Sequence, residues 1–152
     1  MGLADEVRAE HVAKSAAASA KKATHQAQVD ASWQVLVDAL NAICPDVAAA
    51  CVELNAKSDV KGLFRRGWVF YLGFGFGGRE GAGIWALVQP GGGWSFATHE
   101  GSYSNYKTTK ISESRARSAW QSLNPDYAEP RPLWTRDSLL EGFKRAITQK
   151  LG

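Results

Sequence analysis

The stretch that decides the fold is Gly67-Trp68-Val69-Phe70-Tyr71-Leu72-Gly73-Phe74-Gly75-Phe76. Its even positions all carry large apolar side chains, whereas its odd positions carry glycines, a valine and a tyrosine. Alternation with a period of two is typical of a β-strand that buries one face. The other face is almost bare near the strand's end, where another backbone or a ligand can approach closely. We therefore expect Tyr71, Gly73 and Gly75 to lie on a surface that binds a partner.

Glycine-rich segments divide the next part of the chain into further strands. The segments 77–81 and 90–93 carry the residues that favour tight turns. They separate two apolar runs, residues 82–89 and 94–99. The polar segment 101–108 is either a fourth strand or an exposed loop. The sequence therefore predicts an antiparallel meander of three or four strands.

The residues before this meander have the composition of helices. Residues 3–43 contain no glycine or proline, which predicts one long helix or two helices in line. Large apolar residues recur at helical spacing only from Val29 onward, so we divide the chain into an alanine-rich arm, residues 1–28, and one domain, residues 29–152. Pro45 suits a first helical turn and predicts a short second helix over 45–56.

Two more helices are expected after the meander. Ser112 and Thr135 stand where N-caps belong, each ahead of a segment with an apolar face. We expect both of these helices to pack on one face of the sheet, which gives an α+β fold. The bare strand face and the alanine-rich arm are complementary in shape, so they are candidates to pack together, within one chain or between two chains.

Composition and charge limit the classes of function. The chain has 152 residues and a net charge of +3. The charge is uneven, because residues 1–56 carry −3 and residues 57–152 carry +6. A basic second part is compatible with anionic partners. No apolar run approaches the about 20 residues of a membrane span, and no targeting signal is visible, so we expect a cytoplasmic protein that does not bind membranes.

The residues that usually carry catalysis do not cluster. The two cysteines, Cys44 and Cys51, form no C-x-x-C pair, and the histidines at 11, 25 and 99 have no metal-binding spacing. We therefore expect no metal and no cofactor. His99 is the one position where a general base could lie. The string Gly73 to Gly78 matches G-x-G-x-x-G, but a strand follows it where a phosphate-binding loop needs a helix. The balance favours a protein that is not an enzyme.

Two hypotheses for function remain. The first is an interaction or assembly protein that self-associates as a dimer through its arm and binds another macromolecule, such as a protein, through the aromatic and glycine-rich sheet. An isolated arm needs tertiary contacts to be a stable helix, which favours a second copy. The alternative is a nucleic-acid-binding module that uses the basic aromatic region from Tyr103 to Arg117. Its candidate binding residues are Tyr103, Tyr106, Lys107, Lys110 and Arg115.

Overall fold

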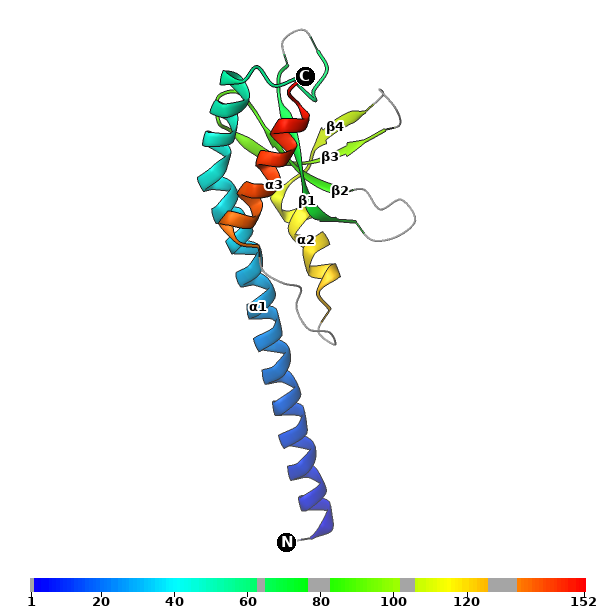
Figure 1. Cartoon of the computed structure of the whole chain (residues 1–152). Coiled ribbons are helices and arrows are strands. Elements are labelled where there is room, and N and C mark those ends of the chain that lie inside the picture. The colour runs from blue at the N-terminus through cyan, green and yellow to red at the C-terminus, as the bar shows by residue number, and fades with distance from the viewer. Residues whose placement is uncertain (1, 63–64, 77–82, 102–105, 126–133) are drawn as a thin grey trace.

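The protein is described by a computed structural model that covers residues 2–62, 65–76, 83–101, 106–125 and 134–152. The N-terminal third forms one helix, α1 (Leu3–Glu53), and the C-terminal part adds α2 (Glu113–Leu123) and α3 (Arg136–Gln149). Between them lie the four strands, which are β1 (Trp68–Gly75), β2 (Gly83–Val88), β3 (Trp94–Glu100) and β4 (Lys107–Lys110). This arrangement confirms the predicted α+β class (Figure 1).

The sheet is an antiparallel meander in which each strand pairs with the next along the chain, in the order β1-β2-β3-β4. The polar segment predicted as a strand or a loop ends in a short edge strand, β4. The register of β1 against β2 shifts between Tyr71 and Gly75. Gly73 lies inside this bulge with φ of +85°, a conformation that favours glycine.

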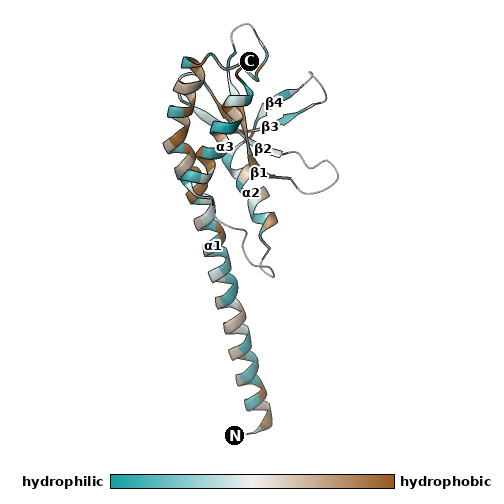
Figure 2. Ribbon diagram, viewed as in Figure 1, coloured by the Kyte–Doolittle hydropathy of each residue, from teal (hydrophilic) through white to brown (hydrophobic). Residues whose placement is uncertain are grey.

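All three helices contribute to a core on one face of the sheet. The even side chains of β1 are buried there together with apolar residues from every helix. Phe70 stacks on Phe143 of α3 at 4.4 Å between ring centroids, and Trp33 of α1 stacks on Phe96 at 5.1 Å. Figure 2 shows hydrophobic residues gathered on β1 and on the part of α1 beside the sheet. The molecule therefore has two layers, with the helices on one side.

Helix α1 continues through Pro45, so the predicted short helix over 45–56 is wrong as a separate element. A proline inside a helix costs about 3 kcal/mol or more, because it removes a hydrogen bond and crowds the preceding turn. Packing on both sides of Pro45 offsets this cost. The neighbouring residues of the same helix that are buried in the core are Ile43, Cys44, Val47 and Ala48.

The first half of α1 projects away from the rest of the molecule (Figure 1). We call residues 3–28 the arm, and every residue in it except the half-buried His25 is exposed. Burial begins at Val29, where α1 reaches the sheet and the other helices. The arm therefore does not pack on the bare strand face of its own chain, and that possibility from the sequence is wrong. Packing between two chains stays a prediction.

Helix α1 also contains a stretch that is long and apolar enough to cross a membrane. Within that stretch, 44% of the residues are buried inside the protein. A core helix of a soluble protein passes the same test of length and composition. The stretch is therefore weak evidence on localisation, and cytoplasmic localisation stays a prediction.

A buried hydrogen bond ties α1 to α2. Trp120 of α2 donates its indole N–H to the Ser32 hydroxyl at 2.8 Å, and that hydroxyl donates to the carbonyl oxygen of Val29 at 2.7 Å. Ser32 is one of the few polar side chains inside the core. A buried indole N–H without a partner is costly. The hydroxyl of Ser32 therefore fixes how α2 sits against α1.

We expect Ser32→Ala to lower the free energy of unfolding by about 1–3 kcal/mol, because it leaves the Trp120 N–H buried and unpaired. Urea unfolding followed by tryptophan fluorescence measures this. The matched control is Ser122→Ala on α2, whose hydroxyl bonds only the preceding turn of its own helix. It should stay within about 0.5 kcal/mol of wild type. Equal effects of the two substitutions would contradict the role assigned to Ser32.

Candidate functional site

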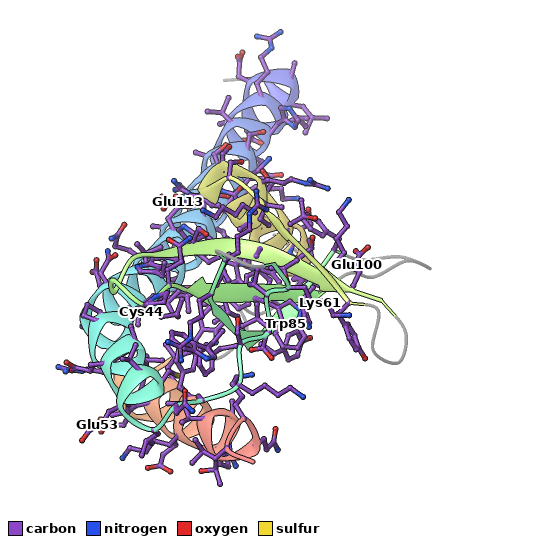
Figure 3. All side chains as sticks on the ribbon, turned by 90° about the horizontal axis from the view of Figure 1, so that it is seen from above. Cys44, Glu53, Lys61, Trp85, Glu100 and Glu113 are labelled. Atoms are coloured by element: carbon purple, nitrogen blue, oxygen red, sulfur yellow. The ribbon has the colours of Figure 1, made fainter. Side chains whose placement is uncertain are left out.

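The second face of the sheet is the candidate site, because the three helices all pack on the first. Near the middle of this open face, Val69, Leu87 and Ala97 form a small buried cluster. Val60, from the segment that leads into β1, packs on that cluster. Figure 3 shows α1 with Cys44 along one side of the sheet, and Trp85 away from that helix. Within the part of the chain that the structure describes, no helix covers the remainder of the open face.

Four aromatic side chains cross the open face as a continuous series, which we call the aromatic ladder. Its members are Tyr71 of β1, Trp85 of β2, His99 of β3 and Tyr106, which directly precedes β4. Successive ring centroids lie 5.2, 5.2 and 4.8 Å apart. His99 and Tyr106 are stacked with an interplanar angle of 8°. The two tyrosines at the ends of the ladder are exposed, whereas Trp85 and His99 are half-buried.

Register and one glycine position the ladder. Tyr71 pairs with Trp85 across β1 and β2, which brings both rings to the same face. The ring of Tyr71 lies over Gly83, where an added Cβ would come within 2.7 Å of the tyrosine Cε1 atom. His99 pairs with Thr108 of β4, and a hydrogen bond of 2.8 Å joins His99 Nδ1 to the Thr108 hydroxyl. Each ring is therefore held by the sheet itself.

Trp85 differs from the other tryptophans in its hydrogen bonding. The other five each donate their indole N–H to a protein oxygen. Within the described residues, Trp85 has no such partner. A half-buried indole on an open face carries an apolar ring and a free donor, a combination that is common where proteins bind ligands.

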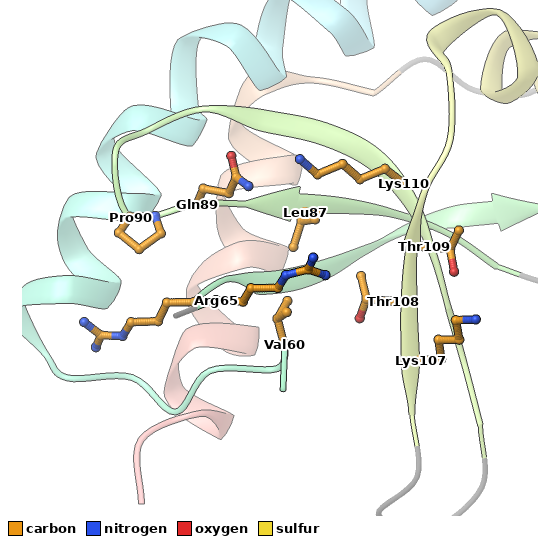
Figure 4. A pocket seen from close by; sticks show the side chains of 10 residues that line it. Val60, Arg65, Leu87, Gln89, Pro90, Lys107, Thr108, Thr109 and Lys110 are labelled. Carbon is orange, nitrogen blue, oxygen red and sulfur yellow. The ribbon is translucent and has the colours of Figure 1, made fainter. Parts of the chain in front are cut away.

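A basic groove adjoins the ladder (Figure 4). It has a volume of about 730 Å³, and its floor includes Leu87, between Val60 and Arg65 on one side and β4 on the other. Four cationic side chains line it, and no acidic side chain is among its described lining residues. The groove meets the ladder at Thr108, which lines the groove and bonds His99. The cations are Arg65, Arg66, Lys107 and Lys110.

The wall of the groove on the β1 side is fixed by one acidic residue, Asp59. Its carboxylate accepts a hydrogen bond of 2.9 Å from the Val69 N–H and forms an ion pair with Lys150 at 2.9 Å. Its own N–H donates to the carbonyl of Gly67 at 2.8 Å. These contacts hold residues 57–60 along the edge of β1 and link them to the end of α3.

The structure brings together some of the residues that the sequence singled out. Tyr71 and Tyr106 are the two ends of the ladder, and Lys107 and Lys110 line the groove. Gly73 and Gly75 lie in the bulged end of β1. Tyr103 lies outside the described residues.

Arg115 lies in the other layer of the molecule. It is part of α2, and its guanidinium covers the ring of Phe76 at 4.9 Å. Arg117 of the same helix pairs with Asp30 of α1 at 3.1 Å, and this hydrogen bond lowers the pKa of the Asp30 carboxyl. The predicted region from Tyr103 to Arg117 is therefore not one surface. Its β4 part faces the groove, and its helical part packs on α1 and the core.

Sequence reasoning missed Trp85 as a candidate. The available signal was the period-two pattern of the second strand, which puts Trp85 on the same face as Leu87. That pattern alone does not say which face stays open. Arg65 and Arg66 precede β1, and only the return of the chain through β4 brings Lys107 and Lys110 to the same groove.

The described residues offer little support for catalysis. Burial raises the pKa of the Cys44 thiol to about 12, so this cysteine is a protonated core residue and a poor nucleophile. No group of three or more metal-ligating side chains occurs among the residues that the structure describes. His99, the candidate base, is instead a half-buried member of the aromatic ladder. The chemistry on the open face is stacking, hydrogen bonding and positive charge.

Stability should depend on the protonation of His99. Burial lowers the pKa of His99 below 6.5, Asp59 opposes this shift, and Lys150 adds to it. As the pH falls through about 6.5, the unfolded chain binds a proton that the folded chain binds only at lower pH. The free energy of unfolding should therefore fall with pH across this window and level off below the folded pKa. His99→Gln should lose this component.

Urea unfolding of wild type and His99→Gln between about pH 5 and 8 measures the difference, and subtraction removes the contribution of the other two histidines. If the free energy of unfolding changes with pH in the same way in wild type and in His99→Gln, the lowered pKa assigned to His99 is wrong. An NMR titration that places the pKa of His99 above 6.5 would contradict it as well.

Comparison with known proteins gives this face no precedent. No protein-family model, no curated protein and no solved structure matches the chain. The function is therefore argued from the residues of the open face and of the arm.

Proposed function

We propose that this protein is a non-enzymatic binding protein that holds an anionic macromolecule on the open face of its sheet. The observation that carries the proposal is the basic groove. Four cations line one hollow of about 730 Å³, and its described lining contains no acidic side chain. Charges of one sign gathered in a concave surface raise the local concentration of ligands of the opposite sign. An extended anion fits this arrangement better than a small neutral ligand.

The chemistry of the lining favours binding. Arg65 presents a planar guanidinium group that matches phosphate or carboxylate oxygens, and Lys107 and Lys110 of β4 add mobile charges. The guanidinium of Arg66 bonds the Asn55 side chain at 3.4 Å and lies over the Trp68 ring at 5.5 Å. Thr108 and Thr109 supply hydroxyl groups, and Leu87, Val60 and Pro90 supply apolar surface. This set contains groups that neutralise and position an anion. It contains no cysteine, serine or carboxylate that could act as nucleophile or base.

Removing positive charge from β4 should weaken the binding of polyanions. We expect Lys107→Gln/Lys110→Gln to reduce affinity for heparin, long-chain polyphosphate and oligo-dT, and to lower the slope of log K against log salt by about 1.4 for oligo-dT. The control is Lys144→Gln/Arg145→Gln in α3, which removes the same charge from exposed positions in the other layer of the molecule. Fluorescence anisotropy at several salt concentrations measures both. Equal losses in the two variants, or no binding of any polyanion at low salt, would overturn the proposal.

We also propose that the protein self-associates through its arm. The arm is a helix of about 40 Å at 1.5 Å per residue, and it is exposed along its length, including Leu3, Val7 and Val12. A helix of this kind is marginally stable in water without tertiary contacts. Alanines at 9, 13, 16, 20, 23 and 27 repeat at alternating spacings of four and three, which lets two helices approach closely.

The charges of the arm favour an antiparallel pair. The acidic residues Asp5, Glu6 and Glu10 lie near its start, whereas Lys14, Lys21 and Lys22 lie farther along. In an antiparallel arrangement the acidic end of one arm lies beside the lysines of the other. The arm points away from the sheet, so a second chain can pack on it without meeting the body of the first (Figure 1).

Deleting residues 1–28 should convert a dimer to a monomer and leave the remainder folded, because burial in the core begins at Val29. Light scattering gives the mass of each species, and near-ultraviolet circular dichroism reports the packing of the core tryptophans. A full-length protein with the mass of one chain at about 100 μM would contradict self-association, since even weak specific interfaces are populated there.

A further inference from the structure

We infer that the anionic macromolecule is a single-stranded nucleic acid, whose bases stack on Tyr71 and Tyr106 while its phosphates lie in the basic groove. The inference rests on the proposed function and adds the aromatic ladder to it. Positive charge alone fits any polyanion. Exposed aromatic rings beside that charge select a polyanion that carries flat, apolar rings of its own.

The two terminal tyrosines have the exposure and support that a stacking platform needs. Tyr71 is 55% exposed and Tyr106 is 45% exposed. Tyr106 uses one ring face against His99, 4.8 Å away and nearly parallel, and Tyr71 rests against Trp85 and Gly83. Each ring is therefore held from within the protein and presents its other side to solvent. A large aromatic side chain that is fixed before binding loses little conformational entropy when a base stacks on it.

The two middle residues of the ladder, Trp85 and His99, offer hydrogen-bonding groups to the ligand. The Trp85 indole N–H has no partner among the described residues, so it is free to donate to a base or sugar oxygen. His99 is neutral at pH 7, since burial lowers its pKa, and it keeps Nε2 after Nδ1 bonds Thr108. The charge that attracts the ligand comes instead from the groove beside the ladder.

The geometry favours a single strand over a duplex. In a duplex the bases are already stacked on each other, so a protein reaches only their edges in the grooves. Tyrosine rings on the open face of a sheet need base faces, which an unpaired strand offers. The ladder crosses four strands spaced about 4.8 Å apart and so spans about 15 Å. That length suits the low end of the roughly 4–16 nucleotides that one small domain covers.

The experiment compares four probes in anisotropy and competition assays with the full-length protein. They are labelled oligo-dT and oligo-U of about 12 nucleotides, a duplex of the same length, and long-chain polyphosphate as the polyanion without rings. Both single strands should bind more tightly than the duplex or polyphosphate. Tyr71→Ala and Tyr106→Ala should each weaken oligo-dT binding by about 5- to 100-fold. Neither should change polyphosphate binding by more than about twofold.

Tyr71→Phe and Tyr106→Phe are the matched controls, because they keep the ring and remove only the hydroxyl. They should bind oligo-dT within about threefold of wild type, since stacking needs the π face. Circular dichroism and urea unfolding establish that each variant is folded. Alanine variants that bind oligo-dT like wild type would overturn the inference, and so would a duplex that binds as tightly as the single strands.

The design separates this inference from the proposed function. If polyphosphate, duplex and oligo-dT all bind equally and all lose affinity in Lys107→Gln/Lys110→Gln, the groove binds anions and the tyrosines are not platforms. If no probe binds at low salt, the proposed function as a protein that binds an anionic macromolecule is wrong. If oligo-dT loses affinity in the alanine variants while its salt slope stays at the wild-type value, stacking and charge contribute separately, which supports the inference.

Discussion

The packing of the even side chains of β1 against all three helices is the contact on which the rest of the molecule depends. Phe74 touches Trp33 of α1, Trp120 of α2 and Trp134 just before α3, with ring centroids 5.4 to 6.1 Å apart. Phe70 stacks on Phe143 of α3. Since successive side chains of a strand point to opposite faces, this packing buries the even side chains of β1 against the helices and turns the odd ones to the opposite face. All three helices therefore lie in one layer, and they leave the opposite face of the sheet open.

The open face is stabilised by a few local contacts in place of a second layer of helices. Val69, Leu87 and Ala97 are buried there under Val60. Asp59 holds that covering segment by bonding the Val69 N–H and pairing with Lys150. Lys150 follows α3, so the groove wall is tied to a helix of the opposite layer. The proposed binding surface is in this way fixed to the core without being covered by it, which holds its rings and cations in place.

Two kinds of interaction contribute to the proposed binding face, namely electrostatic attraction and stacking. The cations act through charge, which salt screens and which does not distinguish one polyanion from another. The rings act through stacking, which is less sensitive to salt and which depends on what the polymer carries. If arms of two chains pair as we propose, one particle presents two such faces. A long strand that reaches both would then be held with an effective concentration far above that of the free protein.

The sequence by itself determined the elements that rest on periodicity and on local chemistry. Alternation from Trp68 to Phe76 predicted β1 and its buried face, and Ser112 and Thr135 predicted the starts of α2 and α3, where both cap their helices. The separate helix predicted from Pro45 was wrong, because the cost of a proline to a helix is local whereas the burial that offsets this cost comes from tertiary packing. The site was decided by the tertiary structure. Tyr71, Trp85, His99 and Tyr106 are spread over thirty-six positions of sequence, and only cross-strand register aligns them. Arg115 lies near Lys110 in sequence but in the other layer, because the chain passes from the edge strand to α2, which packs on the buried face.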